Sequence, residues 1–346
     1  MRVNKQALIA GKYRLERVLG EGGMGIVMRA TNVDLDTPVA LKFLRHEARS
    51  HDQVVARFAQ EGRALARLTS EHVARILDEG ELDDGTPFIV MEYLEGEDLG
   101  AVLAHRGRLP LQEVVTYMLQ VCEALAEAHA ARIVHRDLKP ANIFLTHNQD
   151  GRLIVKVLDF GIAKTLGAAE SLTRTASGLG TVNYIAPEQM LDAKNCDERA
   201  DIWSLGVTLY ELTTGQLPFS GTLHEVFMAI REQRRCGISE LLPSAPARLE
   251  MLVDHCLRND PSLRPASVAH FAAELAALVD TPEHRASSAR IRRVLEPRGS
   301  LHAPALPRDE PADLHSLSPS SIATSETPAD PPATVDPPGH PVVSVA

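Results

Sequence analysis

The stretch RADIWSLGVTLYELTTG, residues 199–215, is apolar nearly all round when its residues are placed at helical spacing. A surface helix shows a single apolar stripe, so a helix that is apolar on every side must be buried on every side. The stretch therefore predicts a central helix that other elements surround. Residues 110–130 carry a second long helical pattern. Both patterns predict that the larger part of the chain is mainly helical.

Strand-like runs precede this helical part. They are YRLERVLG, GIVMRATN, PVALKFL and TPFIVMEYL, which alternate or are continuously apolar and are bounded by Gly, Pro or Asp. Such runs predict a β-rich first part. We expect a globular unit at residues 13–278, with a strand-rich part at 13–94 and a helical part at 95–278, after a short extension over residues 1–12.

The composition changes near residue 280. Twelve of the 22 prolines lie in residues 281–346, and this range contains no Phe, Tyr or Trp. Such a segment cannot bury enough apolar surface to offset the entropy of ordering it. Residues 279–346 are therefore expected to form a disordered tail. The basic stretch around Arg290 could form a short amphipathic helix, but a linker is the preferred interpretation.

Charge, cysteine content and hydropathy exclude several classes of protein. The formal net charge of -10 argues against a nucleic-acid-binding protein, which usually presents a basic face. The cysteines have no metal-site or redox spacing and are interpreted as reduced core thiols; they are Cys122, Cys196, Cys236 and Cys256. No apolar run approaches the roughly 20 residues that cross a bilayer, and no signal peptide is recognised. We expect a cytoplasmic protein without a membrane span.

A glycine-rich turn joins the first two strand-like runs. In GEGGMGIV, Gly20, Gly22 and Gly25 lack side chains that would keep backbone amides away from phosphate oxygens. By itself the pattern is equally typical of an ordinary glycine-rich hairpin.

Two charged residues fall in apolar surroundings. Lys42 lies in the short strand VALK, and Glu61 falls on the apolar face of the helix that follows. A charge in such a place is costly unless an opposite charge meets it, so we predict that the two pair inside the protein. The alternative is a tolerated charge at the edge of each element.

The loop IVHRDLKPANIFL carries polar residues between two apolar stretches. Asp137 can accept a proton from a hydroxyl, Lys139 can neutralise charge on a transferring phosphoryl group, and the Asn142 oxygen can ligate a hard cation. In KVLDFGIAK, Asp159 ends an apolar strand and can hold a metal that bridges phosphates. Together these residues predict phosphoryl transfer.

With these motifs in order, and with APE at residues 186–188, the chain resembles the eukaryotic-type (Hanks-type) Ser/Thr protein kinase family over residues 13–278. It is most similar in appearance to bacterial Ser/Thr kinases. The resemblance implies an α+β fold of two lobes. The N-lobe would be small, antiparallel and β-rich with one helix, and the larger C-lobe would be mainly α-helical.

The resemblance also implies roles for individual residues. Lys42 would hold the α- and β-phosphates of ATP while paired with Glu61, and Asp137 would be the catalytic base. Asn142 and Asp159 would bind Mg²⁺, with Mn²⁺ as an alternative, and Lys139 would stabilise the γ-phosphate. The adenosine site would use further residues: Leu19, Val27, Ala40 and Phe144 around adenine, Met91 as gatekeeper, Glu92 and Leu94 at the hinge, and Asp98 at the ribose.

Structural and specificity roles follow from the same resemblance. Glu188 would pair with Arg264, and Asp201 would brace the catalytic loop. The DLKP motif, which contains Lys139, would favour Ser/Thr over Tyr acceptors, and so would Thr181.

The segment between DFG and APE is polar and glycine-bearing. It carries Thr173 and Thr175, and Arg136 beside the catalytic Asp could receive a phosphate on either. We therefore predict autophosphorylation of both threonines, which self-association would assist, although an unmodified solvated loop is the alternative.

Three other functions are the alternatives. A pseudokinase scaffold would usually lack one of the catalytic residues, and a small-molecule phosphotransferase would not be expected to show all of these motifs. A tyrosine kinase is disfavoured by Lys139 and Thr181.

Overall fold

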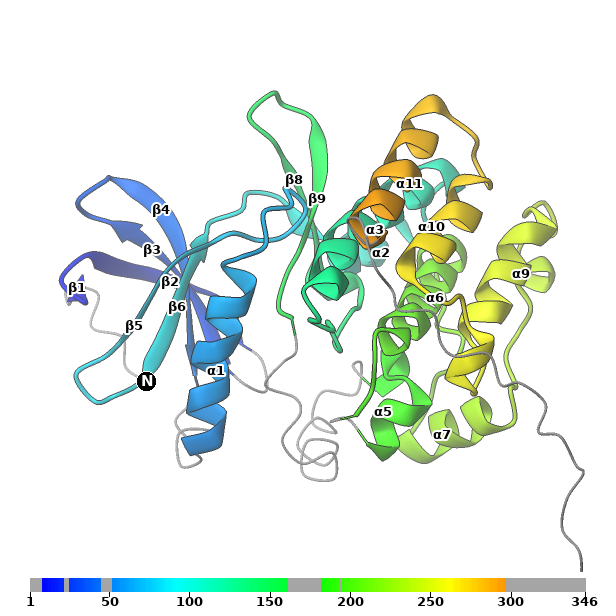
Figure 1. The fold of residues 1–346 in the computed structure, drawn as a ribbon, viewed down its shortest axis with the longest axis horizontal. Helices are drawn as coiled ribbons and strands as arrows, with labels where there is room; N and C mark the ends of the chain where they lie inside the picture. The colour runs from blue at the N-terminus through cyan, green and yellow to red at the C-terminus, as the bar shows by residue number, and fades with distance from the viewer. Residues whose placement is uncertain (1–7, 22–24, 45–51, 161–181, 193–194, 297–346) are drawn as a thin grey trace, which may run out of the picture. The chain divides into compact units, whose positions relative to one another are not determined.

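A computed structural model of the chain describes residues 8–21, 25–44, 52–160, 182–192 and 195–296 (Figure 1). For part of the helix over residues 52–65, including Glu61, the description covers the backbone and not the side chain.

The N-terminal part is a six-stranded antiparallel sheet in the order β1-β2-β3-β4-β6-β5. Its strands are β1 (Leu8–Ile9), β2 (Tyr13–Glu21), β3 (Gly25–Asn32), β4 (Thr37–Leu44), β5 (Ile76–Glu81) and β6 (Pro87–Glu92). Helix α1 (Asp52–Leu65) lies against one face, where Phe58 packs with Leu44 and Ile89 (Figure 1). The other face buries a second apolar cluster that includes Tyr13 and Phe88. The predicted β-rich part with one helix is confirmed.

The rest of the described chain is mainly helical. Its α-helices are α2 (Leu99–Arg106), α3 (Leu111–Ala130), α5 (Pro187–Leu191), α6 (Arg199–Thr214), α7 (Leu223–Arg231), α8 (Ile238–Leu241), α9 (Ala247–Cys256), α10 (Val268–Ala276) and α11 (Pro282–Leu295). Short 3-10 turns are η2 (Pro140–Asn142), η4 (Val182–Tyr184) and η5 (Pro261–Leu263). The α+β class predicted from the sequence is therefore confirmed.

Helix α6 is the predicted central helix. All of its residues except Arg199 and Glu211 are buried, as its all-round apolar pattern requires. Gly206 allows α6 and α9 to touch, because an added Cβ would lie 2.5 Å from the Cβ of Cys256. Gly215 ends the helix in the left-handed region at φ 76°, where a residue without Cβ is favoured.

A small three-stranded sheet joins the two parts. It consists of β7 (Glu97–Asp98), β8 (Ile143–His147) and β9 (Leu153–Val157), in that order. The loop before β5 lies along β9: Val73 and Val157 form a parallel bridge, and the N–H of Ala74 donates to the Val157 carbonyl at 3.1 Å. The strand before DFG is therefore bonded to the segment that leads into β5 of the N-terminal sheet.

Helix α11 corrects one expectation. Disorder was predicted from residue 279, but residues 282–295 form a helix that packs on α3 and α10 (Figure 1). Ile291 is fully buried there, and Arg290 donates to both carboxylate oxygens of Glu123 at 2.6 and 3.0 Å. The proline-rich composition of the whole range concealed this helix, whose buried face holds only His284, Ser287 and Ile291. The predicted disorder after residue 296 lies outside the described residues.

The cysteine expectation is partly wrong. Cys122, Cys196 and Cys256 are buried free thiols, whereas the Cys236 thiol is free and exposed. None of the described helices is both long and apolar enough to span a bilayer.

We predict that α11 contributes to the stability of the folded unit. Ile291→Ala should lower the free energy of unfolding by about 2–5 kcal/mol, because it leaves a cavity between α11 and its neighbours. Val294→Ala, on the exposed side of the same helix, should change it by no more than about 0.5 kcal/mol. Urea denaturation of the full chain measures both. Equal effects of the two substitutions would contradict the packing of α11.

Candidate functional site

The loop between α3 and β8 is held by one buried carboxylate. Asp201, on α6, accepts hydrogen bonds from the backbone N–H groups of His135 and Arg136, both at 2.9 Å, and from Nε2 of His129 at 2.8 Å. Its side chain has no exposed surface. Burial alone would raise the pKa of Asp201, but the hydrogen bond and charge of His129 and the proximity of His135 lower it overall. The predicted bracing role of Asp201 is consistent with these contacts.

His135 connects the loop to the strand before Asp159. Its Nδ1 accepts from the backbone N–H of Asp137 at 3.2 Å, and its Nε2 lies 3.0 Å from the carbonyl oxygen of Leu158. Burial lowers the pKa of His135, partly opposed by the charge of Asp201. The neutral ring with a proton on Nε2 fits both bonds, because one nitrogen must accept and the other donate. Its ring also packs on Phe160, with centroids 4.5 Å apart.

Three of the predicted polar residues meet in this loop. Nδ2 of Asn142 donates to the backbone oxygen of Asp137 at 2.7 Å and to its Oδ2 at 3.1 Å, and Nζ of Lys139 lies 3.2 Å from the same Oδ2. The Asp137 side chain is only 11% exposed. A carboxylate held in this way has a fixed direction, as a group that must receive a proton from a positioned hydroxyl requires.

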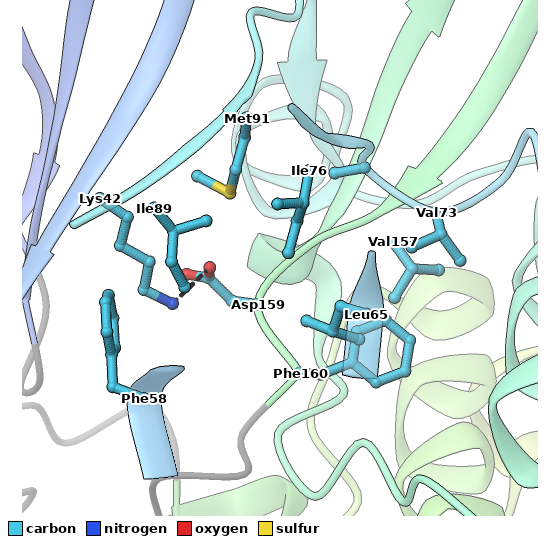
Figure 2. Close-up of a pocket in the computed structure, with 11 residues that line it drawn as sticks. Lys42, Phe58, Leu65, Val73, Ile76, Ile89, Met91, Val157, Asp159 and Phe160 are labelled. Atoms are coloured by element: carbon cyan, nitrogen blue, oxygen red, sulfur yellow. Dashed lines mark hydrogen bonds and ion pairs between the residues drawn. The ribbon is translucent and has the colours of Figure 1, made fainter. Parts of the chain in front are cut away.

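Asp159 lies beside this loop and pairs with Lys42. The Leu158 N–H donates to the Asn142 carbonyl oxygen at 2.9 Å, which ties the strand before Asp159 to the loop. Nζ of Lys42 lies 2.7 Å from Oδ1 of Asp159. Figure 2 marks this ion pair with a dashed line. A cavity of about 30 Å³ opens beside this pair, lined mainly by apolar side chains such as Phe58 and Met91.

Two backbone positions here are in the left-handed region. Asp159 has φ 49° and Arg136 has φ 63°. Residues other than glycine rarely adopt such values, and they persist where surrounding bonds over-determine the backbone. At Arg136 the bond from its N–H to Asp201 and the bond from Gln189 Nε2 to its carbonyl oxygen supply that constraint.

The predicted adenine residues come from adjacent strands of the N-terminal sheet. Val27 is the cross-strand partner of Lys42, and Ala40 is the partner of Met91. Partners across a ladder share a face, and so do residues two apart along a strand. Val27, Ala40, Lys42 and Met91 therefore lie on one face of the sheet. Leu19, at the end of β2, is 37% exposed.

The predicted glycine positions have different surroundings. An added Cβ at Gly20 would meet no described atom within 4 Å, so there is room beside its backbone. At Gly25 an added Cβ would lie 2.3 Å from the carbonyl oxygen of Phe43, so close packing of β3 on β4 already requires a glycine there. Gly22 lies outside the described residues.

The predicted hinge and ribose residues follow β6. The Glu92 backbone N–H donates to the Arg75 carbonyl oxygen at 2.9 Å, and Leu94 is partly buried in the segment after β6. Oδ1 of Asp98 accepts from the Ala101 N–H at 3.0 Å and so caps α2, a role that the sequence analysis did not anticipate.

The predicted pair of Glu188 and Arg264 is present. The guanidinium contacts both carboxylate oxygens, at 2.6 and 2.7 Å, and the Arg264 side chain is fully buried. Arg264 also donates to the backbone oxygens of Arg199 and Arg258. The pair thereby connects α5, which follows the activation segment (the residues between DFG and APE), to the start of α6.

Further sequence predictions concern parts that are not described. The side chain of Glu61 is among these, so its pairing with Lys42 stays a prediction. Thr173, Thr175 and Thr181 also lie outside the described residues.

Sequence reasoning missed the pair of Lys42 with Asp159 and a second charged pair at the site. Lys156 is 8% exposed in the apolar strand β9, and its Nζ lies 2.7 Å from Oε1 of Glu92. The signal was a lysine inside LIVKV, which is the same signal that drew attention to Lys42 in VALK.

The residues at the site suit a hard divalent cation. Asn142 uses Nδ2 for its bonds to Asp137, which leaves its carbonyl Oδ1 as the atom suited to coordination. Asp159 supplies a carboxylate, and oxygen donors of these two kinds are what Mg²⁺ prefers. The described residues include no cluster of three or more His, Cys, Asp or Glu side chains that could hold a metal by itself. The oxygen atoms of Asn142 and Asp159 fit a hard divalent cation.

Comparison with known proteins gives the family. The model of the family described as "Protein kinase domain" matches residues 13–275, well over half of the chain. The chain therefore belongs to the protein kinase family, as the ordered motifs and the two-part fold indicated. Membership implies the use of ATP and a divalent metal ion, and proteins as substrates.

Two similar curated proteins are bacterial kinases. The serine/threonine-protein kinase pkn3 of Myxococcus xanthus is 41% identical over 291 residues, which are 81% of this chain and 52% of that protein. The serine/threonine-protein kinase PknL of Mycobacterium tuberculosis (strain ATCC 25618 / H37Rv) is 36% identical over 293 residues, which are 83% of this chain and 71% of that protein. The chain thus spans about half the length of the Myxococcus protein.

A solved structure agrees with the fold. The crystal structure of the Mycobacterium tuberculosis PknI kinase domain matches with a TM-score of 0.63 at 28% identity, and the match covers 80% of this chain and all of that one. The predicted bilobal kinase-like fold is confirmed.

The carboxylate of Asp201 predicts a pH-dependent stability. Its folded pKa lies below the unfolded value of about 3.9, so its contribution is present above about pH 4 and is lost as the pH falls through the folded pKa. Asp201→Asn should lower the free energy of unfolding at pH 7 by about 3–5 kcal/mol, because it removes a buried charged acceptor. The difference in the free energy of unfolding between this variant and the wild type should become smaller towards pH 3. Urea denaturation at several pH values would measure it.

The matched control is Asp280→Asn, which removes a carboxylate from an exposed ion pair with Arg285. That variant should stay within about 0.5 kcal/mol of the wild type at pH 7. A gap for Asp201→Asn that does not change with pH would contradict the role given to its charge.

Proposed function

We propose that the chain is a serine/threonine protein kinase that transfers the γ-phosphate of ATP to Ser and Thr hydroxyls of proteins in signal transduction. The observation that carries the proposal is the convergence of Asp137, Lys139 and Asn142 with Asp159 and Lys42, from elements far apart in the sequence. Phosphoryl transfer depends mainly on positioning and on stabilisation of charge, and these residues can supply both.

Asp137 is the proposed catalytic base. Its carboxylate is oriented by Asn142 and neighbours the ammonium of Lys139, so it can accept the proton of an acceptor hydroxyl while Lys139 meets the charge of the γ-phosphate. Sequence spacing supports the same assignment, because Asp137 occupies the Asp position of the HRD motif.

Lys42, Asp159 and Asn142 are the proposed phosphate and metal residues. Lys42 would hold the α- and β-phosphates with Glu61 as its partner, and the oxygens of Asp159 and Asn142 would coordinate Mg²⁺, with Mn²⁺ as an alternative. The bound cation would supply positive charge to the phosphates. Gly20, Gly22 and Gly25 would bring backbone amides to the same phosphates.

The proposed adenosine site lies between the two lobes. Val27 and Ala40, on the sheet face that carries Lys42, would cover one side of adenine with Leu19, and Phe144 on β8 would form the other. Met91 would close the back of the site. Backbone groups of Glu92 and Leu94 would meet the base edge, and Asp98 would reach the ribose while it caps α2.

Acceptor choice and location remain predictions from the sequence. Lys139 in DLKP and Thr181 favour Ser/Thr acceptors, and the names of the similar bacterial kinases agree. Self-association for autophosphorylation and a cytoplasmic location are the corresponding expectations for partners and place.

A kinase assay tests the proposal. With radiolabelled ATP, Mg²⁺ and a generic Ser/Thr protein acceptor, the wild type should transfer phosphate, and Asp137→Asn should be slower by about 10²–10⁴-fold because the base is lost. Lys42→Met should lose activity similarly. Arg285→Gln, in an exposed ion pair of α11, should keep wild-type activity.

Equal transfer by the wild type, Asp137→Asn and Lys42→Met would exclude the catalytic assignment. Binding of ATP without transfer by the wild type would favour a pseudokinase scaffold. Transfer to small hydroxyl compounds in place of protein would favour a small-molecule phosphotransferase.

We further infer that the activation segment is autophosphorylated at Thr173 and Thr175. Arg136 supports this proposal: within the described part of the chain its buried Nε has no hydrogen-bond partner, and its Nη2 makes only a long bond of 3.4 Å to the Cys196 carbonyl oxygen. A phosphate brings three acceptor oxygens that such a guanidinium can bind.

Mass spectrometry after incubation with ATP and Mg²⁺ should find phosphate on Thr173 and Thr175 in the wild type. The same sites should be unmodified in Asp137→Asn, because that variant lacks the base and so controls for contaminating kinases. An active wild-type enzyme with both threonines unmodified would overturn the prediction.

A further inference from the structure

An ion pair links the end of β6 to the middle of β9. Nζ of Lys156 lies 2.7 Å from Oε1 of Glu92, and the two residues are 64 positions apart in the sequence. The side chains are 10% and 27% exposed. An ion pair so shielded from water is held more firmly than the exposed pairs of the surface.

Burial of Lys156 leaves its ammonium few partners. Its neighbours in the strand, Val155 and Val157, are buried and apolar, and the other contact of Nζ is the Val73 carbonyl oxygen at 3.4 Å. An ammonium removed from water is costly unless an opposite charge meets it, so the position of Lys156 depends on Glu92.

Glu92 is held from a second direction. The same Oε1 accepts from the Arg75 backbone N–H at 2.7 Å, while the Glu92 N–H donates to the Arg75 carbonyl oxygen at 2.9 Å. Side chain and backbone of Glu92 are therefore both fixed, and the ammonium of Lys156 is attached to a rigid point at the end of the N-terminal sheet.

The pair connects two elements next to proposed parts of the adenine site: β9, which pairs with the strand of Phe144, and the end of β6. Lys156 is the cross-strand partner of Phe144, which makes their side chains neighbours on one face of the β8–β9 hairpin. Glu92 directly follows Met91 and carries one of the backbone groups proposed to meet the base edge. The strand then continues from Lys156 to Asp159 within three residues.

We propose that Lys156 is a positioning residue for the nucleotide site. Through its ion pair with Glu92 it sets the separation between the hinge backbone and the Phe144 side chain, and hence the fit of the adenine ring. Lys156 contacts Glu92 and the residues around its own strand, and it does not take part in phosphate transfer. The inference rests on the proposed function, because it assumes that adenine binds between Phe144 and the hinge.

A purely structural pair would behave differently. It would change stability and leave the affinity of the folded protein for nucleotide unaltered. A positioning pair changes KM for ATP while kcat stays nearly the same, because the lost contact is made equally in the ground state and in the transition state. Comparison of KM with kcat therefore separates the two roles.

The experiment uses the full chain with four changes: Lys156→Met, Lys156→Arg, Glu92→Gln, and the double variant Lys156→Met with Glu92→Gln. Arg106→Met is the control, since it breaks a different ion pair, between Arg106 on α2 and Glu113 on α3. KM for ATP and kcat are measured with a generic Ser/Thr protein acceptor. Isothermal titration with ADP and Mg²⁺ measures binding without turnover, and the unfolding midpoint shows that each variant is folded.

Lys156→Met and Glu92→Gln should each raise KM for ATP and Kd for ADP about fivefold, a loss of about 1 kcal/mol of binding, with kcat within about twofold. The double variant should have the same KM and Kd as the single variants, because all three lose the same ion pair. Lys156→Arg should restore most of the affinity by keeping the charge, and Arg106→Met should bind as the wild type does.

The inference is wrong if folded Lys156→Met binds ADP like the wild type, whatever its stability. Both single variants could fail to fold, because each leaves one charge buried without a partner. In that case the double variant, which removes both charges, is the test: the inference is wrong if the folded double variant binds ADP like the wild type. A wild-type chain that neither binds ADP nor transfers phosphate would instead refute the proposed function, and the inference with it.

Discussion

The site depends on the carboxylate of Asp201. This group lies at the start of a helix that is buried on all sides. It accepts hydrogen bonds from the backbone N–H groups of two consecutive residues of the catalytic loop, His135 and Arg136. These bonds help to hold Arg136 at a positive φ and direct the next residue, Asp137, towards Asn142 and Lys139. The central helix that first constrained the fold is therefore also the support of the proposed chemistry.

The β8–β9 hairpin connects the catalytic loop to the rest of the site. At its start, Asn142 is bonded to Asp137 and to the backbone N–H of Leu158. In its middle, Lys156 reaches Glu92 at the end of the N-terminal sheet. Just after it, Asp159 meets Lys42 on β4. One short hairpin thus connects the proposed base, the proposed metal residues and the proposed hinge, because each contact begins on it or next to it.

Sequence patterns predicted the elements well where each pattern is strong by itself. The predicted helix α6 and the predicted N-terminal strands are present in the structure. Their apolar patterns have the periods that helix and strand geometry require. Helix α11 was missed because its buried face holds one large apolar residue, Ile291, beside His284 and Ser287. Its start was readable, since Thr281 caps the helix and Pro282 occupies the first turn.

The sequence by itself determined which chemical groups are available and in what order: the HRD loop with Asp137, Lys139 and Asn142, and the DFG aspartate, Asp159. These depend on residue type and short spacing, which the chain carries locally. Only the tertiary structure decided which charges meet across long separations, such as Lys42 with Asp159 over 117 positions. Such pairing depends on how the strands are arranged, because a buried ammonium takes whichever anion the fold brings within reach.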